Sequence, residues 1–290
     1  MRTLREALQS ARFAITADLS MPHQESTDRL LHDADLLKGA VDSIELGGNA
    51  LGGARASPLA LANLLLQRGI DATPHLNCRD HNRIALQSDL LGLRAAGVSS
   101  LVLTEGLHNM ASEEPAAKPV FDIHCQGLIA MANAMNEEEW PEGKHEFVIG
   151  TAAEACLPGP DWSVDELLAR AKAGARFIQT RLCFDLPLMR QYVQQLVETK
   201  VTWHCSVFVT LAPLPSAEIA RWLVENIPGT QIPDALIKRM QDSARPHQEG
   251  IDICAEHIRE IAQLPGVSGI RLLCLDHPEA VLASIEAAGL

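Results

Sequence analysis

The chain has 290 residues, 47% of them hydrophobic, and its net charge is −13. Such a charge argues against nucleic acid and anionic membrane surfaces as partners, because both would repel the protein. The N-terminus lacks the apolar core of a signal peptide, no stretch of 18 apolar residues is present, and seven cysteines, an odd number, fit a reducing compartment better than a disulfide framework. We therefore expect an acidic, cytoplasmic protein.

Eight short runs of β-forming residues alternate with amphipathic segments along the whole chain. Each run ends just before polar or glycine-containing residues. The runs are 13–18, 43–46, 71–75, 99–104, 146–150, 176–181, 205–211 and 268–274. Eight strand–helix alternations predict a single (β/α)8 TIM barrel domain over residues 1–290. The chemistry of such a barrel lies at the carboxyl ends of its strands.

Leucine spacing, serine and proline starts and glycine stops predict the intervening helices. Their expected ranges are 3–10, 27–39, 57–69, 80–96, 121–136, 164–173 and 186–199. Three further helices, 216–226, 233–242 and 247–263, are expected between the last two strands, where one helix would suffice. Residues 106–120 form a long loop after the fourth strand, where lids and binding loops belong.

Several segments, in order along the chain, resemble the methylenetetrahydrofolate reductase family. They are 74–80 (PHLNCRD), 101–104 (LVLT), 173–180 (AGARFIQT), 213–216 (PLPS) and 228–234 (PGTQIPD). Each is weak alone, but together they are fairly specific and cover nearly the whole chain. The resemblance implies an α/β barrel that reduces 5,10-methylenetetrahydrofolate to 5-methyltetrahydrofolate. NADH or NADPH is the implied reductant, and FAD usually relays the hydride.

The resemblance places the catalytic acid at Asp18, which ends the first strand. The family has a glutamate there, one methylene longer, and an acid is needed to open the folate ring. Desolvation at an apolar strand end can raise the pKa of such a carboxyl group. A carboxylate that merely caps the next turn is the structural alternative.

Three further residues fall near folate-binding positions of the family. Arg181 stands where a glutamine normally binds the pterin, and it can donate hydrogen bonds or pair with Glu105 or Asp18. Glu105 lies one residue before the family's aspartate position, which here is Gly106. His277 falls near an arginine that contacts folate. The structural alternatives are a loop carboxylate for Glu105, a buried ion pair for Arg181 and a solvated loop residue for His277.

His75, Thr104, Gly106 and Arg170 would line the cofactor by the same resemblance. Residues 45–53 (ELGGNALGG) replace a threonine-containing turn, and 151–160 lack an aromatic residue and a histidine that many flavin-binding relatives have. A core histidine is the alternative for His75. The spacing His75-x2-Cys78-x2-His81 also invites a metal site, but no obvious further ligands converge with it. We therefore predict none.

These departures leave three rival hypotheses open. One is a flavin-free reductase of the same fold, in which the nicotinamide transfers its hydride directly. Another is a folate-dependent methyltransferase or demethylation protein without redox chemistry. The last is a non-catalytic folate-binding paralogue that acts as a subunit of another chain. A homo-oligomer is compatible with all of them.

Overall fold

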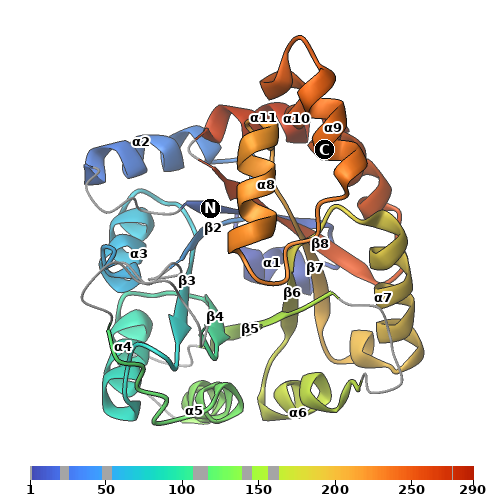
Figure 1. The fold of residues 1–290 in the computed structure, drawn as a ribbon. Coiled ribbons are helices and arrows are strands. Elements are labelled where there is room, and N and C mark those ends of the chain that lie inside the picture. Colours follow the sequence, from blue (N-terminus) through green and yellow to red (C-terminus); the bar gives the residue numbers. More distant parts are fainter. Residues whose placement is uncertain are drawn as a thin grey trace.

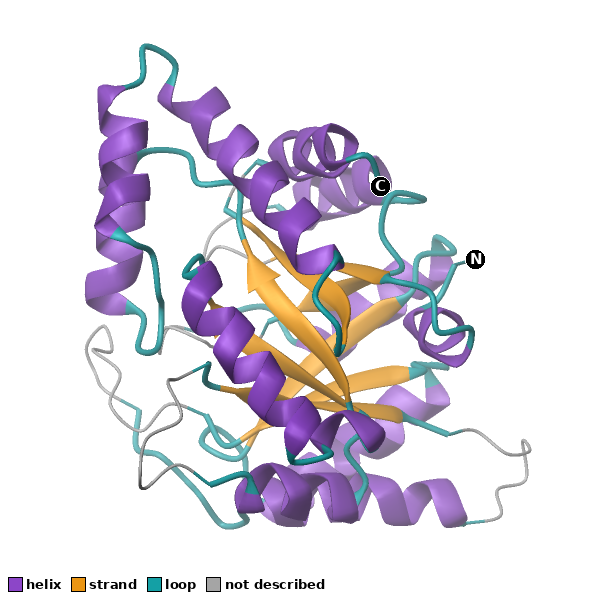
Figure 2. Ribbon diagram, turned by 90° about the vertical axis from the view of Figure 1, so that its right-hand side faces the viewer, coloured by secondary structure: helices purple, strands orange, loops and turns teal. Residues whose placement is uncertain are grey.

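The computed structural model describes residues 2–19, 26–47, 54–106, 117–138, 146–155, 163–275 and 277–290. Its eight parallel strands form a closed barrel in sequence order, and the last strand pairs with the first. Helices surround the strands (Figures 1 and 2). The predicted (β/α)8 barrel is thus confirmed.

All eight predicted strands are present, each shifted by at most a few residues. They are β1 Ala14–Leu19, β2 Ser43–Leu46, β3 Ala72–Asn77, β4 Ser100–Thr104, β5 Val148–Ala153, β6 Phe177–Leu182, β7 Ser206–Leu211 and β8 Val267–Cys274. Most of their residues are buried, because one face of each strand lines the barrel interior and the other packs under the helices.

The predicted helices are also present. They are α1 Leu4–Gln9, α2 Thr27–Leu37, α3 Pro58–Gln67, α4 Arg83–Ala95, α5 Cys125–Glu137, α6 Asp165–Ala173, α7 Leu186–Glu198, α8 Ala217–Asn226, α9 Asp234–Asp242 and α10 Pro246–Ala262. Side chains of Ser26, Asn82, Asp185 and Ser216 cap four of them. The extra helices α8, α9 and α10 confirm the predicted elaboration before the last strand.

Two short elements were not predicted. One is the 3-10 helix η1 Val201–Trp203, and the other is α11 Pro278–Ala288, which packs against α10 and α2. The signals for α11 are in the sequence, since Pro278 opens it and Gly289 ends it with φ of +81°. No helix in the described residues has the length and hydrophobicity needed to cross a membrane.

Helix α1 closes the amino-terminal end of the barrel. Leu4 and Ala7 of this helix pack on an apolar layer that includes Phe177 and Phe208. The two phenylalanine rings lie 5.5 Å apart, and Gly150 leaves room for them, because a Cβ at that position would come within 2.2 Å of the Phe177 ring. The amino end is thus filled with side chains, so an internal site has room only toward the carboxyl end.

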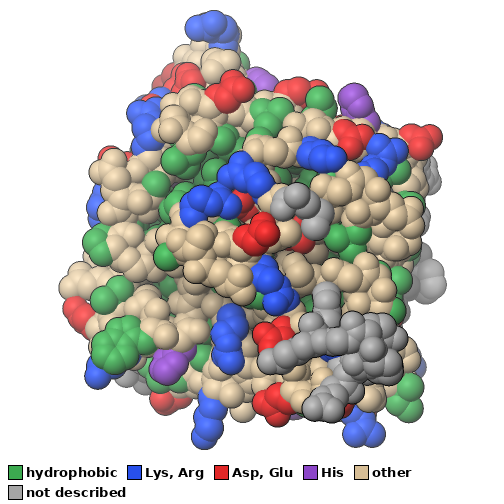
Figure 3. Space-filling view, turned by 180° about the vertical axis from the view of Figure 1, so that it is seen from behind, with side chains coloured by type: hydrophobic (Ala, Val, Ile, Leu, Met, Phe, Trp, Pro, Cys, Tyr) green, Lys and Arg blue, Asp and Glu red, His purple; other side chains and the backbone are tan. Residues whose placement is uncertain are grey.

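Figure 3 shows acidic and basic side chains interspersed on the face opposite to that of Figure 1.

Candidate functional site at the carboxyl end of the barrel

A cluster of polar side chains fills the carboxyl-terminal half of the barrel interior. We call it the polar network, and it consists of Thr16, Asp18, Glu45, His75, Gln179 and Arg271. Five different strands contribute these residues: β1, β2, β3, β6 and β8. The chain therefore has to close into a barrel before they meet.

Glu45 lies at the centre of the polar network and is fully buried. Its Oε1 accepts hydrogen bonds from Thr16 Oγ1 and Gln179 Nε2, both at 2.5 Å. Its Oε2 lies 2.8 Å from His75 Nε2 and 2.9 Å from Arg271 Nε. Strands β2 and β6 are not neighbours, so the bond to Gln179 crosses the barrel interior.

The charge of Glu45 is stabilised in spite of its burial. Burial raises the pKa of this carboxyl group, but the Arg271 charge and the hydrogen bonds from His75 and Thr16 together outweigh it and lower the pKa to about 2. Glu45 is therefore a carboxylate at neutral pH.

Asp18 forms an ion pair with Arg271, the same cation that pairs with Glu45. Its Oδ2 forms an ion pair with Arg271 Nη2, and the Asp18 side chain is only 6% exposed. Ligand atoms of Asp18, Glu45 and His75 all lie within 4.8 Å of one another, a grouping that would suit a metal ion. Arg271, however, already pairs with both carboxylates and supplies the positive charge that they need.

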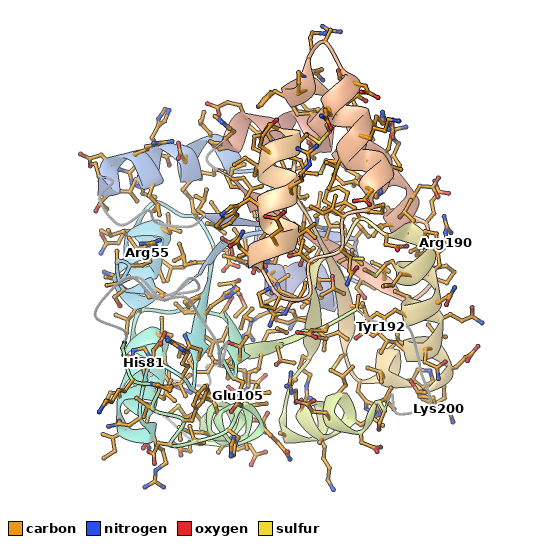
Figure 4. The ribbon with its side chains drawn as sticks, viewed as in Figure 1. Arg55, His81, Glu105, Arg190, Tyr192 and Lys200 are labelled. Atoms are coloured by element: carbon orange, nitrogen blue, oxygen red, sulfur yellow. The ribbon has the colours of Figure 1, made fainter. Side chains whose placement is uncertain are left out.

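The three residues expected at folate-binding positions do not share one site. Glu105 accepts a 2.6 Å hydrogen bond from the backbone N–H of Cys125, at the start of α5 (Figure 4). Its other oxygen lies 3.0 Å from Nδ1 of His124. Glu105 thus satisfies a helix N-terminus, the loop role that the sequence left open.

The expected pairing of Arg181 with Glu105 or Asp18 is wrong. Arg181 Nε instead lies 3.2 Å from Glu154 Oε1, beyond the end of β5. His277 is exposed, and its ring packs edge-on against His247 at 5.5 Å. A direct role of His277 or Arg181 in folate binding stays a prediction.

The three residues of the His75-x2-Cys78-x2-His81 spacing do not share one set of partners. Cys78 is buried, and burial, with Cys125 and Glu105 nearby, raises the pKa of its thiol to about 12. His75 bonds to Glu45, whereas His81 Nε2 lies 4.0 Å from Asp89. The three motif residues therefore face different surroundings.

Gly106 and Thr104, two of the positions expected along the cofactor, are closely packed against the end of β3. Gly106 has φ of +88°, and a Cβ there would lie 2.6 Å from Arg79 Cβ and 3.2 Å from Asn77 Oδ1. This position therefore has no space for the aspartate that the family places between flavin and folate. The backbone of Thr104 is also engaged, since its carbonyl accepts from Cys78 N at 3.1 Å.

Arg170, the expected basic contact, is used within the protein. Its Nη1 donates to the carbonyl of Ala152 at 2.7 Å and to Thr151 Oγ1 at 3.3 Å, and its Nη2 pairs with Glu166. The guanidinium ties α6 to the end of β5, and a contact of Arg170 with a cofactor stays a prediction. Residues 48–53, 107–116 and 156–162, in the glycine-rich turn, the predicted loop and the segment after β5, lie outside the described residues.

A pocket of about 200 Å³ adjoins the polar network at the end of β3. His75 and Asn77 line it from the strand, and Arg55 and His81 line it from the starts of α3 and α4 (Figure 4). Of the polar network, only His75 borders this pocket. It is the place where a ligand can approach the imidazole.

Sequence reasoning identified Asp18 and His75 but missed the roles of Glu45, Gln179 and Arg271. A signal was present for Arg271, because a lone charge within the apolar run SGIRLLC predicts a buried ion pair. Glu45 gives a similar signal as the lone charge in the run SIEL, whereas Gln179 carries no charge and gives none. Their partners lie on strands far away in the sequence.

The fold and site define a (β/α)8 barrel with a charged network at the carboxyl ends of its strands. The chain belongs to the methylenetetrahydrofolate reductase family, whose model, described as "Methylenetetrahydrofolate reductase", matches residues 3–289. No protein of curated function matches the chain in sequence.

Solved structures share the fold at low sequence identity. An uncharacterized protein from Clostridium thermocellum that binds two copies of 5-methyl-5,6,7,8-tetrahydrofolic acid superposes with a TM-score of 0.67 at 13% identity, covering 98% of this chain and 97% of its own. Tryptophan synthase from Mycobacterium tuberculosis gives 0.55 at 14% identity, with 98% and 96% covered. A 2,3-dimethylmalate lyase gives 0.54 at 13% identity, with 98% and 84% covered.

Proposed function

We propose that this chain binds a reduced folate at the carboxyl end of its barrel and reduces 5,10-methylenetetrahydrofolate to 5-methyltetrahydrofolate, with NADH or NADPH as hydride donor. The observation that carries this proposal is the polar network, which lies inside the family's barrel where the family has its proposed acid. Family membership supports the reaction class, and the charges support the substrate class.

The charges of the polar network are complementary to a pterin ring. The pterin edge carries N–H donors beside a carbonyl oxygen. A carboxylate such as Asp18 can accept from the donors, and a guanidinium such as Arg271 can donate to the oxygen. Arg181, 27% exposed, is the further cation that we assign to the folate.

The proposed reaction needs one proton and one hydride. A proton is added to N10 of the folate, the bond between N10 and the methylene carbon breaks, and an iminium ion forms at N5. The nicotinamide then gives a hydride to the methylene carbon and leaves as NAD⁺ or NADP⁺. We propose direct transfer from the nicotinamide, because Gly106 stands where the family places an aspartate beside the flavin and Arg170 is engaged by Ala152 and Glu166. The family resemblance assigns the proton to Asp18.

The test is the visible spectrum of the purified protein, before and after incubation with FAD and desalting, combined with an assay of NAD(P)H oxidation. The proposal expects a colourless protein that oxidises NADH or NADPH only with methylenetetrahydrofolate present and forms 5-methyltetrahydrofolate. Retained flavin that NADH bleaches and the folate restores would overturn direct transfer. No oxidation with either nucleotide, with or without FAD, would overturn the reductase.

A second candidate is folate-dependent methyl transfer or demethylation without redox chemistry. Two observations favour it. The Clostridium thermocellum neighbour binds 5-methyltetrahydrofolic acid, and Asp18 is paired with a cation here rather than free to act as an acid. Calorimetric binding of 5-methyltetrahydrofolate without NAD(P)H oxidation, together with turnover that depends on a corrinoid or a methyl acceptor, would support this candidate.

A further inference from the structure

We propose that His75, oriented by Glu45, is the group that delivers the proton to the folate nitrogen, in place of the carboxyl group at the end of β1. This inference rests on the proposed function, because it names the proton donor of that reaction. Two residues of the polar network then have separate roles: Asp18 binds the pterin edge, and His75 donates the proton.

The hydrogen bond between His75 and Glu45 fixes the state of the imidazole. Nε2 of His75 lies 2.8 Å from Oε2 of Glu45. Glu45 carries no proton near neutral pH, so Nε2 must donate this bond and Nδ1 is the nitrogen left for a ligand. In the described part of the chain, Nδ1 has no hydrogen-bond partner. A histidine held by a buried carboxylate through one nitrogen and open at the other is the arrangement of general acid–base catalysis.

His75 and Asp18, the two candidate proton donors, also differ in solvent exposure. The His75 side chain is 17% exposed and borders the pocket at the end of β3, whereas Asp18 is 6% exposed and paired with Arg271. Their polar atoms lie within 4.8 Å of each other, so a substrate nitrogen that approaches one is close to the other.

The charged groups around His75 come from several elements. Glu45, Asp18 and Arg271 face it from β2, β1 and β8. Across the pocket lie Arg55, His81 and Asp89. Within the polar network, two carboxylates and one guanidinium therefore surround His75.

The step balances without another reagent. The Nδ1–H bond of the imidazolium breaks as the N10–H bond forms, and the electron pair of the breaking carbon–nitrogen bond stays on N10. Neutral His75 keeps the proton on Nε2, which still donates its hydrogen bond to Glu45. Solvent restores the proton on Nδ1 before the next turnover.

The experiment compares variants in two assays. One assay is NAD(P)H oxidation with methylenetetrahydrofolate. The other is enzyme-dependent exchange of ¹³C-formaldehyde into the methylene bridge, which needs ring opening but no hydride. The variants are His75→Gln, Glu45→Gln and Asp18→Asn. His204→Gln, an exposed histidine remote from the polar network in the sequence, is the matched control, and circular dichroism confirms folding.

The expected result is a loss of about 100-fold or more in kcat and in exchange for His75→Gln, with the KM for folate changed by less than about threefold. Glu45→Gln loses about tenfold and Asp18→Asn less than about tenfold in kcat, because each affects the donor only through its surroundings. Added imidazole restores activity to His75→Ala, which a merely structural role of His75 would not allow.

The outcomes separate this inference from the proposed function. Near-normal exchange in His75→Gln with a loss of more than about 100-fold in Asp18→Asn makes Asp18 the donor and overturns the inference. Exchange that depends on His75 without any NAD(P)H oxidation keeps the inference and overturns the reductase. A wild-type chain that catalyses neither reaction overturns both.

Discussion

Asp71 and Glu45 are buried carboxyl groups toward opposite ends of this barrel, and their pKa values are shifted in opposite directions. Asp71, just before β3, accepts a hydrogen bond from the backbone N–H of Leu4 in the helix that closes the amino end. Burial raises its pKa to about 6, against partial compensation by hydrogen bonds and by Arg5. Glu45, at the other end, has a pKa of about 2, because the Arg271 charge and the hydrogen bonds from His75 and Thr16 outweigh the same penalty.

The comparison shows that burial alone does not decide the charge of a carboxyl group. Around Asp71, the hydrogen bonds and the Arg5 charge do not outweigh the cost of burial, so the proton is favoured. At the carboxyl end a guanidinium lies in direct contact, so the carboxylate is favoured. The amino end therefore has the electrostatics of a structural core, and the carboxyl end those of a site.

The largest expected effect comes from removing the shared cation. Arg271→Met leaves Asp18 and Glu45 without their ion-pair partner, and we expect the free energy of unfolding to fall by about 3–5 kcal/mol at pH 7. Urea denaturation measures this change. The matched control is Arg190→Met, which breaks the exposed pair with Glu260 and is expected to cost less than about 1 kcal/mol. Equal effects of the two variants would show that the polar network does not depend on Arg271.

The pH dependence of stability separates the two carboxylates. The folded-state pKa of Glu45 lies below its ordinary value of 4.5, so the unfolded state binds more protons and this contribution grows as pH rises from about 2 to 4.5. For Asp71 the folded-state pKa lies above the ordinary 3.8, so the folded state binds more protons. Its contribution is therefore lost as pH rises from about 4 to 6.

Asp71→Asn isolates the second of these contributions. We expect this variant to remove a fall in stability on the order of 2–3 kcal/mol between pH 4 and 6. Urea unfolding at half-unit pH steps measures it, with the exposed Asp35→Asn as control. An unchanged slope in Asp71→Asn would mean that Asp71 is ionised in the folded protein.

The smallest effect concerns the position that the family gives to aspartate. Gly106→Ala adds backbone strain at φ of +88° and a clash with Arg79. Gly97→Ala has the same strain at φ of +86°, but no atom lies within 4 Å of its Cβ. We expect a loss of about 1 kcal/mol for Gly97→Ala and about 1–2 kcal/mol more for Gly106→Ala by thermal unfolding. Equal losses would remove the steric argument against a side chain at this position.

The sequence predicted the architecture well because strands and helices leave local periodic signals. The runs around Ile44, Leu103 and Val209 are apolar and short, and capping residues separate them from the helices. A local signal of this kind needs no knowledge of distant partners.

The site was predicted only in part, because its contacts depend on which strands face each other across the barrel. Asp18 was identified from its place at a strand end, but its partner Arg271 is 253 residues away. From the sequence, Arg181 could pair with Glu105 or Asp18. Arg181 and Glu105 each pair instead with a nearer group, Glu154 or the start of α5. The positions of the Arg181 and Glu105 side chains therefore follow from partners that are closer in the sequence.

The pairing of β8 with β1 has a consequence for synthesis of the chain. Asp18 and Glu45 are made within the first 45 residues, whereas Arg271 lies in the last strand. Until that strand is released from the ribosome, a growing chain that folded its first strands would have two carboxylates side by side and no cation between them. Charge repulsion would then oppose closure of the nascent barrel until Arg271 in the last strand is available.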